Sequence, residues 1–334
     1  MLNFLTTADD RTGALEVAGA IAEEGFLVNA GSTITSGDCL VIDLETRHDS
    51  AAMAAQRIKK IHQTAAGARC HKIDSVLRGN WPHEVKALLD MGFGIDVVPS
   101  FPDAGRRCSQ GIVYVNDIPV AESASAADPL NPVATSRPME LLHAAGCTGR
   151  NVRVLDANDN DELAQVAQRC RNERRMLVGP TGAIQAFAAT FGRPRSLQNF
   201  VLQEPILIVC GSLHPVSRNQ IRRLQCPLYT VDDAFQLSDR LCVLTTIEPT
   251  RTPDLKAARA TAKALASFSQ SADPVGTLMV IGGDTAAAIL GNDTIKVLGN
   301  LGVAIPVANR NAQLLVTKGG GIGKPDTLVD LLST

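Results

Sequence analysis

Hydrophobic residues along the chain follow two patterns that alternate with each other. Short apolar runs rich in β-branched residues predict strands, and longer stretches with apolar residues three and four positions apart predict helices. The predicted strands are Leu2–Thr7, Cys39–Leu44, Arg69–Asp74, Ile95–Val98, Val152–Leu155, Met176–Val178, Ile206–Cys210, Cys242–Thr245, Leu278–Ile281 and Gln313–Thr317. The predicted helices include Thr12–Glu24, Ala51–Thr64, Pro82–Leu89, Asp161–Arg171 and Leu255–Phe268. This alternation is typical of an α/β protein built on a largely parallel sheet.

The alternation is interrupted at two places. Residues 121–138 are small and polar and include prolines, which predicts a long surface loop. Residues 192–205 carry two prolines and precede a strong apolar strand, which is typical of a linker. A chain of 334 residues is long enough for about two domains. We therefore predict two domains, residues 1–200 and 205–334, each with a largely parallel sheet flanked by helices.

The composition restricts the classes of function. The 32 basic and 34 acidic side chains give a formal net charge of −2, and only 4% of residues are aromatic, which argues against nucleic-acid binding. The eight cysteines contain no Cys-x-x-Cys pair, so neither a zinc site nor a redox motif is indicated. The N-terminal segment lacks a signal-peptide pattern, and no apolar run approaches the roughly 18 residues of a membrane helix. We expect a cytoplasmic protein with reduced thiols and no nucleic-acid or membrane partner.

Three times in the C-terminal part, an apolar strand leads into a glycine-rich turn and then toward a helix. In an open α/β sheet such turns lie on one edge, where backbone amides and helix dipoles converge on one anion. Lys318 and Lys324 add positive charge, so a nucleotide polyphosphate is the expected ligand. The candidate binding residues are Gly211, Ser212 and His214 in the first turn, Gly282, Gly283, Asp284 and Thr285 in the second, and Lys318, Gly319, Gly320, Gly321 and Gly323 in the third. The alternative is that these glycines only make tight connections, because the chain has no Walker motif and no G-x-G-x-x-G after its first strand.

Two adjacent carboxylates, Asp9 and Asp10, follow the first predicted strand. Asp10 or Thr12 would cap the following helix, and a carboxylate there is also favoured by the helix dipole. Because two neighbouring aspartates cannot both cap one helix, we expect at least one of them to be available for chemistry.

Further polar residues follow other predicted strands of the N-terminal part. An arginine at a strand end binds a carboxylate through two parallel hydrogen bonds, which suits an acidic substrate. A purely structural ion pair between Asp74 and Arg78 is the alternative. Polar residues at several strand ends indicate a substrate crevice, and its candidate residues are Arg47, Lys72, Asp74, Ser75, Arg78, Gly79 and Arg106.

Several of these motifs occur together, in the same order, in one family. They are Ala8-Asp9-Asp10 with Thr12-Gly13-Ala14, Glu45-Thr46-Arg47, Lys72 through Gly79, Pro99 through Gly111, Gly211-Ser212, Gly282 through Thr285, and Thr317-Lys318 with its glycines. With these motifs the chain resembles the four-carbon acid sugar kinases, ATP-dependent enzymes that phosphorylate threonate, erythronate or oxo-tetronate at the terminal hydroxyl. It departs from the family at Arg11, at Leu15-Glu16 and in the Gly-Gly-Gly-Ile-Gly loop. These three differences bear on which sugar acid is bound more than on the kinase chemistry.

The resemblance implies an N-terminal domain for the sugar acid, a C-terminal domain for ATP and Mg²⁺, and an active site in the crevice between them. In that arrangement Asp9 or Asp10 orients the terminal hydroxyl and accepts its proton. Arg78, with Lys72 or Arg47, binds the substrate carboxylate. The glycine turns hold the β- and γ-phosphates beside Lys318. The resemblance leaves the Mg²⁺ ligands open and is compatible with a homodimer.

Two other functions compete with this hypothesis. A non-catalytic sensor of sugar acids or nucleotides would keep the crevice without turnover, and the altered Arg11 and Glu16 are compatible with that. An NAD-linked oxidoreductase would use Asp43 for the ribose, but the glycine fingerprint that binds the dinucleotide is missing. Release of ADP in the presence of four-carbon acids separates an enzyme from a sensor.

Overall fold

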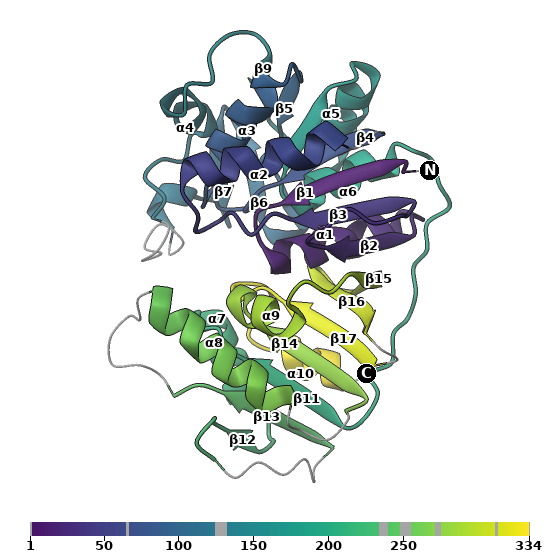
Figure 1. Ribbon diagram of the computed structural model, residues 1–334, viewed down its shortest axis with the longest axis vertical. Helices are drawn as coiled ribbons and strands as arrows, with labels where there is room; N and C mark the ends of the chain where they lie inside the picture. Colours follow the sequence, from purple (N-terminus) through teal and green to yellow (C-terminus); the bar gives the residue numbers. More distant parts are fainter. Residues whose placement is uncertain are drawn as a thin grey trace.

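Among the residues that the structure describes, one sheet of 14 strands forms the centre of the molecule (Figure 1). The computed structural model describes residues 2–64, 67–123, 132–233, 240–247, 255–270, 275–310 and 313–333. In spatial order the strands are β12 (Leu228–Tyr229), β13 (Leu241–Thr245), β11 (Ile206–Cys210), β14 (Thr277–Ile281), β17 (Gln313–Lys318), β16 (Ile305–Arg310), β15 (Ile295–Gly302), β2 (Val28–Gly31), β3 (Cys39–Asp43), β1 (Phe4–Ala8), β4 (Ala68–Lys72), β10 (Met176–Gly179), β5 (Ile95–Val97) and β9 (Val152–Val154).

Helices flank this sheet, and a second, small sheet adjoins it. The helices are α1 (Arg11–Glu23), α2 (Ala51–Thr64), α3 (Trp81–Asp90), α4 (Pro138–Ala144), α5 (Asn160–Asn172), α6 (Thr181–Ala189), α7 (Pro215–Arg222), α8 (Leu255–Gln270), α9 (Gly283–Leu290) and α10 (Thr327–Leu332), with 3-10 turns η1 (Pro102–Ala104) and η2 (Val120–Glu122). The small antiparallel sheet contains β6 (Arg106–Ser109), β7 (Ile112–Val115) and β8 (Ile118–Pro119). The predicted α/β class is confirmed.

All of the predicted strands and helices are confirmed, because each overlaps an observed element. The predicted surface loop at 121–138 is tested only at its ends, since residues 124–131 lie outside the described residues. Within that stretch η2 extends to Glu122, and α4 already begins at Pro138. The strands that were not predicted are mostly short or, like β15 and β16, interrupted by residues such as Gly299, Gly302 and Pro306.

The hairpin β15–β16 joins the N-terminal and C-terminal parts of the sheet. β15 pairs antiparallel with β2, with Val297 opposite Val28, and β16 pairs antiparallel with β17. β15 and β16 also pair antiparallel with each other, and the remaining pairs of the large sheet are parallel. The pairing of β15 with β16 contains two register shifts, one between Val297 and Gly299 and one between Asn300 and Gly302. The expectation of a separate sheet for each part is therefore wrong, because this unpredicted hairpin connects them.

A shared hydrophobic core also links the two parts. Phe4 of β1 and Val17 of α1 are fully buried in the same cluster as Ile295 of β15 and Leu315 of β17. The predicted linker, residues 192–205, contains no helix or strand and runs along the outside of the molecule (Figure 1). The division into two domains at this segment stays a prediction, since the sheet and the core are continuous across it.

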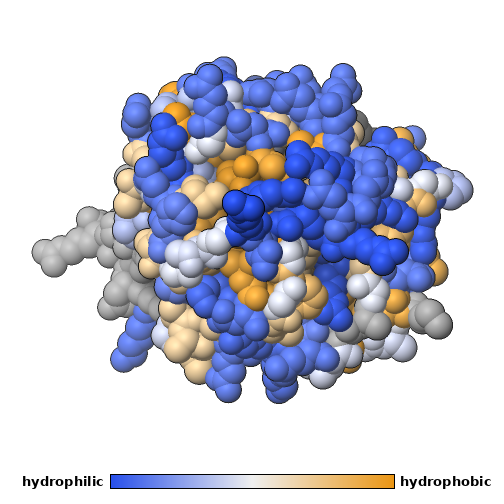
Figure 2. All heavy atoms as spheres, turned by 90° about the horizontal axis from the view of Figure 1, so that it is seen from above, coloured by the Kyte–Doolittle hydropathy of each residue, from blue (hydrophilic) through white to orange (hydrophobic). Residues whose placement is uncertain are grey.

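Polar side chains cover most of the end of the molecule that lies uppermost in Figure 1. Seen from above, that surface is largely hydrophilic, and hydrophobic side chains gather only in limited patches near its middle (Figure 2). Among the described residues, no helix combines the length and the apolar character that crossing a bilayer requires.

The continuous sheet and core predict cooperative unfolding of the whole chain. Trp81 is the one tryptophan of the sequence and is fully buried in α3, so its fluorescence reports the N-terminal part. Far-ultraviolet circular dichroism reports helices and strands of both parts. We expect the two signals to give the same midpoint in urea. Two separated transitions would instead show that residues 1–200 and 205–334 unfold as independent domains.

Candidate active site

The end of β1 places two carboxylates at the start of α1. Asp10 is the N-cap of α1, and its Oδ1 accepts a hydrogen bond from the Gly13 backbone N–H at 2.9 Å. The Asp9 side chain is fully buried, whereas 18% of the Asp10 side chain is exposed. Asp10 is therefore the more accessible of the two carboxylates.

Arg47, in the loop after β3, binds both of these carboxylates. Its Nε donates to Asp9 Oδ2 at 2.8 Å, its Nη2 donates to Asp9 Oδ1 at 3.0 Å, and its Nη1 donates to Asp10 Oδ2 at 2.7 Å. Nη2 also lies 3.6 Å from Asp74 Oδ2. Both aspartates therefore have side-chain partners, and the availability of one of them for chemistry stays a prediction.

The charges around these groups fix their protonation. Burial raises the pKa of Asp9, and the positive charge of Arg47 only partly offsets it. Burial also acts to raise the pKa of Asp10, but Arg47 and Lys72 outweigh burial and lower it overall. For Lys72, burial favours the neutral amine, but Glu16 and Asp10 outweigh it and raise the pKa. Asp10 is thus ionised and Lys72 is a cation at neutral pH.

Asp74 and Arg78 form the ion pair that the sequence analysis gave as the structural alternative. Arg78 donates from Nε to Asp74 Oδ1 at 3.1 Å and from Nη2 to Asp74 Oδ2 at 2.7 Å. Burial acts to raise the pKa of Asp74, but the charges of Arg78 and Arg47 hold it well below its usual range. Because this edge of the Arg78 guanidinium already binds a carboxylate, it is not available to grip a substrate in the same way.

Arg106 offers a donor that Arg78 lacks. Its Nε is buried and has no hydrogen-bond partner among the described residues, while its Nη1 donates to the carbonyl of Ala104. Burial lowers the pKa of Arg106, and the negative charges of Asp74 and Glu16 partly offset this. The Arg106 guanidinium therefore interacts electrostatically with both carboxylates. A buried N–H without a partner costs free energy, which a substrate carboxylate would recover.

Gly79 lets the turn after β4 pack against the Arg47 cluster. Its φ is +89°, and a Cβ there would lie 3.2 Å from Asp9 Oδ2 and 3.4 Å from Arg47 Cγ. Ser75 lies half-buried in the same turn, directly after Asp74. A glycine is therefore required both by the backbone conformation and by the close approach.

The three glycine turns of the C-terminal part lie against one another, as expected. A Cβ on Gly211 would lie 2.1 Å from Thr285 Oγ1, and one on Gly282 would lie 3.2 Å from the Ser212 backbone N. A Cβ on Gly320 would lie 2.3 Å from Ser212 Oγ. Only glycines permit such an approach, so three segments that are distant in the sequence pack closely together in one place.

The second glycine turn also contacts the carboxylates of the N-terminal part. A Cβ on Gly283, the first residue of α9, would lie 3.2 Å from Asp10 Oδ2 and 3.5 Å from Thr12 Oγ1. The Thr12 hydroxyl is buried without a partner among the described residues. In Figure 1 α9 lies just below α1, at the junction of the two parts. The structure thus brings two half-sites together, the carboxylates at the end of β1 and the glycine turns of the C-terminal part. The predicted crevice between them stays a prediction.

Lys318 is the last residue of β17 and stabilises the third turn. Its ammonium group donates to the carbonyls of Gly319 and Ile322, both at 3.0 Å, and the Lys318 side chain is fully buried. Burial lowers the pKa of Lys318 to about 8. The third turn is long, since the next helix, α10, begins only at Thr327. The role of Lys318 as a cation beside the phosphates stays a prediction.

The remaining candidate residues shape the same turns. His214 is the N-cap of α7, and its Nδ1 accepts from the Val216 backbone N–H at 3.2 Å. A Cβ on Gly321 would lie 3.2 Å from His214 Nε2, and Gly323 has a φ of +89°. Asp284 lies in the first turn of α9 and partly offsets the lowering of the His48 pKa by burial.

The residues that bind a metal are not apparent from side-chain geometry. Within the described part of the chain, no group of three or more His, Cys, Asp and Glu side chains is arranged to hold a metal ion. Mg²⁺ that arrives with a nucleotide needs only one or two protein carboxylates in addition to phosphate oxygens. Asp10 and Asp284, on the two sides of the junction, have the oxygen ligands that suit it.

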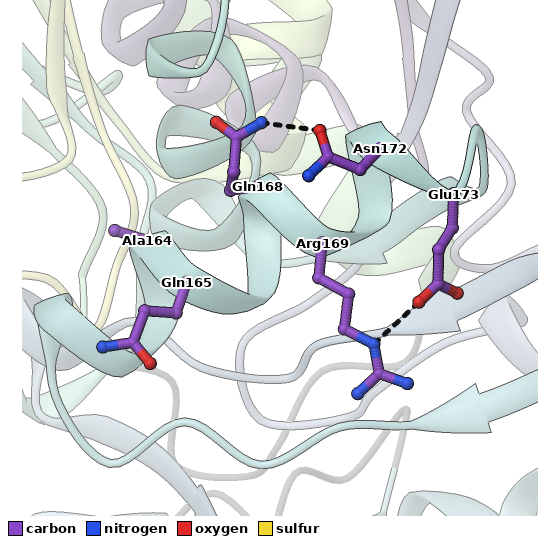
Figure 3. Close-up of a pocket in the computed structure, with 6 residues that line it drawn as sticks. All are labelled: Ala164, Gln165, Gln168, Arg169, Asn172 and Glu173. Carbon is purple, nitrogen blue, oxygen red and sulfur yellow. Dashed lines mark hydrogen bonds and ion pairs between the residues drawn. The ribbon is translucent and has the colours of Figure 1, made fainter.

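A hollow elsewhere on the surface does not compete with this site. It lies beside α5, where exposed side chains form the pairs Gln168–Asn172 and Arg169–Glu173, with donor–acceptor distances of 2.9 Å (Figure 3). These contacts join residues one helical turn apart, which is ordinary surface stabilisation of a helix. None of the candidate site residues lines this hollow.

The sequence and structure are similar to those of known proteins. Residues 4–178, more than half of the chain, match the family model of a sugar-binding N-terminal domain. The chain is 25% identical to a D-threonate kinase of Salmonella typhimurium, covering 99% of this chain and 98% of the relative. It is also 25% identical to a 3-oxo-tetronate kinase of Methylobacterium radiotolerans, covering 96% of each. With a D-threonate kinase of Bordetella bronchiseptica the identity is 26%, over 65% of this chain and only 61% of the relative.

Solved structures share the fold over nearly the whole chain. A Haemophilus influenzae protein superposes with a TM-score of 0.71 at 19% identity, covering 99% of both chains. A domain of unknown function from Bordetella bronchiseptica, solved with bound citrate as a domain-swapped dimer, gives a TM-score of 0.51 at 22% identity, covering 98% of this chain and 96% of that one. At these identities the likeness supports the fold alone.

Arg11 and Asp43 are both buried; the sequence suggested Asp43 only as a ribose ligand of the alternative oxidoreductase and Arg11 only as a departure from the family. Arg11 is 2% exposed, and its guanidinium donates to the carbonyl of Asp293 in the C-terminal part. Asp43 Oδ1 accepts from the Glu45 backbone N–H at 2.9 Å, while Oδ2 is buried without a partner among the described residues. Burial raises the pKa of Asp43 to about 7. The sequence signals were the departure of Arg11 from the family pattern and the position of Asp43 at the end of a predicted strand.

The raised pKa of Asp43 predicts a pH-dependent stability. An aspartate that binds its proton more tightly when folded contributes stability below its ordinary pKa of 3.8, and that contribution is lost as the pH rises through about 7. Asp43→Asn removes this loss of stability, because an amide does not ionise as the pH rises. We expect the variant to match the native protein near pH 4 and to exceed its free energy of unfolding by up to about 4 kcal/mol at pH 8, measured by urea unfolding.

The matched control is Asp38→Asn, which should behave in the opposite way. Burial acts to raise the pKa of Asp38, but its hydrogen bonds from Arg193 and Asn3 lower it overall, so its stabilising contribution is present at pH 8 and lost in acid. If the difference between Asp43→Asn and the native protein did not change with pH, the buried carboxyl would not titrate as described.

Proposed function

We propose, because the chain belongs to the four-carbon acid sugar kinase family, that it transfers the γ-phosphoryl group of ATP to the terminal hydroxyl of a four-carbon sugar acid. The relatives named above are kinases of D-threonate and 3-oxo-tetronate, and a further one is a D-erythronate kinase of Heliobacterium modesticaldum. The observation that carries the proposal is the approach of Gly283 to Asp10, because it sets a phosphate-binding turn against an ionised carboxylate.

The acid binds on the N-terminal side of this contact. The unpartnered Nε of Arg106 binds one oxygen of the substrate carboxylate, and the Lys72 ammonium group adds positive charge nearby. Arg78 keeps its bond to Asp74 and contributes long-range charge. A substrate carboxylate would thus provide the hydrogen-bond partner that the buried Arg106 Nε lacks. This favours acids over neutral sugars as substrates.

Asp10 accepts the proton of the substrate hydroxyl. The hydroxyl oxygen forms a bond to the γ-phosphorus, the bond from phosphorus to the β–γ bridging oxygen breaks, and ADP leaves with that electron pair. Arg47 keeps Asp10 ionised and aims its carboxylate, so the proton acceptor is ready before the nucleotide arrives. A low pKa makes Asp10 a weak base, which is sufficient because phosphoryl transfer depends mainly on position and charge.

The three glycine turns bind the phosphates through backbone amides. The N-terminus of α9 adds its dipole, and Lys318 holds the third turn in shape through the carbonyls of Gly319 and Ile322. Mg²⁺, when bound with the nucleotide, neutralises charge on the β- and γ-phosphates. The N-terminal and C-terminal parts close around both substrates, and this closure keeps water from the reacting atoms.

A homodimer also fits this proposal. The Bordetella bronchiseptica domain with the same fold is a domain-swapped dimer, and the extended segment at residues 192–205 would allow an exchange of the parts that it connects. Sedimentation at several protein concentrations distinguishes a dimer from a monomer.

The direct test is release of ADP in a coupled assay with D-threonate, D-erythronate and 3-oxo-tetronate. We expect ADP formation that depends on at least one of these acids. Binding of both ligands without ADP release would favour the alternative of a sensor, and no binding of nucleotide would reject both functions.

Replacing the proton acceptor is expected to slow the chemical step. Asp10→Asn should lower kcat by about 10²- to 10⁴-fold and leave the Kd for ATP unchanged, because the amide still caps α1 but accepts no proton. Asp161→Asn, an exposed change in α5, is the control and should retain full activity. Near-normal turnover of Asp10→Asn would remove Asp10 from this role.

A methyl group at the junction is expected to separate the two half-sites. In Gly283→Ala the new Cβ would press on Asp10 Oδ2 at 3.2 Å, and we expect kcat/KM for ATP to fall about tenfold or more. Gly302→Ala is the matched control, because a Cβ there meets no atom closer than 3.7 Å. Equal activity of the two variants would contradict the proposed meeting point.

A further inference from the structure

A chain of buried polar side chains leads from α2 to the loop that carries Arg47. His62 Nε2 and His71 Nδ1 each lie 3.0 Å from the hydroxyl of Thr7. His71 Nε2 lies 3.0 Å from Glu84 Oε2, and the other oxygen of Glu84 accepts a hydrogen bond from the hydroxyl of Thr46. All five residues are at most 1% exposed, so these bonds are shielded from water.

The hydrogen bonds of this chain have one favourable direction. Burial lowers the pKa of His62 to about 3, so His62 is neutral and carries one ring proton. Its Nδ1 is buried without a partner among the described residues, which costs least when that nitrogen carries no proton. His62 Nε2–H then donates to Thr7, Thr7 donates to His71 Nδ1, and His71 Nε2–H donates to Glu84. Glu84 is left as the acceptor of two hydrogen bonds, one from His71 and one from Thr46.

The far end of this chain adjoins the candidate base. Thr46 precedes Arg47, and the backbone N–H groups of both residues donate to the carbonyl of Asp9, at 2.9 and 3.2 Å. Glu45, on the other side, has a φ of +52°, a conformation that a non-glycine residue adopts only at a cost. A loop with such a residue needs anchors. Asn80 Nδ2 holds its backbone through the carbonyls of Thr46 and Asp49, and Glu84 holds the hydroxyl of Thr46.

From these contacts we propose that Glu84, oriented by His71, is a positioning residue that holds Thr46 and so aims the Arg47 guanidinium at Asp9 and Asp10. Neither His71 nor Glu84 touches the site itself. The kinetic part of this inference rests on the proposed kinase function, whereas the structural part does not.

The test compares two substitutions of Thr46. Thr46→Val keeps the shape of the side chain but removes the hydroxyl, and it leaves one oxygen of the Glu84 carboxylate buried without a partner. Thr46→Ser keeps the hydroxyl. We expect Thr46→Val to lower kcat about tenfold with the Kd for ATP unchanged, and Thr46→Ser to restore kcat to within about twofold of the native value.

Amide hydrogen exchange over residues 44–49, measured without any substrate, gives a readout that does not depend on activity. We expect exchange in this segment to be about tenfold faster in Thr46→Val than in Thr46→Ser, and unchanged elsewhere in α1 and α3. If the native protein phosphorylated none of the acids but the exchange difference appeared, the kinase function would fail and the positioning role would stand. If the two variants agreed in exchange, the positioning role would be overturned.

Discussion

The position of Arg47 between three carboxylates is the interaction on which the site depends. Asp9 and Asp10 are adjacent in sequence, and their mutual repulsion in a buried place would be costly without a cation between them. Arg47 donates to both and also lies near Asp74. Losing one partner from a buried ionic cluster typically costs about 3–5 kcal/mol. The same cation lowers the pKa of Asp10, so one contact supports both the fold of the loop and the chemistry proposed for it.

A second constraint comes from the sheet. The antiparallel hairpin of β15 and β16 joins two parallel regions of the sheet. Without this hairpin, nothing in the sheet would fix the position of the strand ends of one region relative to those of the other. α1 packs over this hairpin within the shared core, and its first residues, Arg11 and Thr12, reach the C-terminal part. The glycine turn at Gly283 therefore contacts Asp10 as a consequence of how the core is packed. Any closing motion has to preserve the hairpin.

Much of the fold and part of the site were predictable from sequence because their signals are local. Buried parallel strands appear as apolar runs, and Asp10 and the Asp74–Arg78 pair are cap and turn features within a few residues. The β15–β16 hairpin was missed because its glycines and Pro306 weaken the strand pattern. Thr46 and Glu84 are 38 residues apart and each sits in an ordinary local pattern, so no periodicity indicates their contact. Likewise, nothing near Lys318 in the sequence indicates that its ammonium group binds carbonyls of its own loop.

Phosphate and acid are expected to meet where Gly283 approaches Asp10. A crystal structure with a non-hydrolysable ATP analogue and a four-carbon acid tests this most directly. The account predicts the terminal phosphate against the three glycine turns, the substrate hydroxyl beside Asp10 and the substrate carboxylate on Arg106. A nucleotide bound away from these turns, or an acid bound out of reach of Asp10, would contradict it.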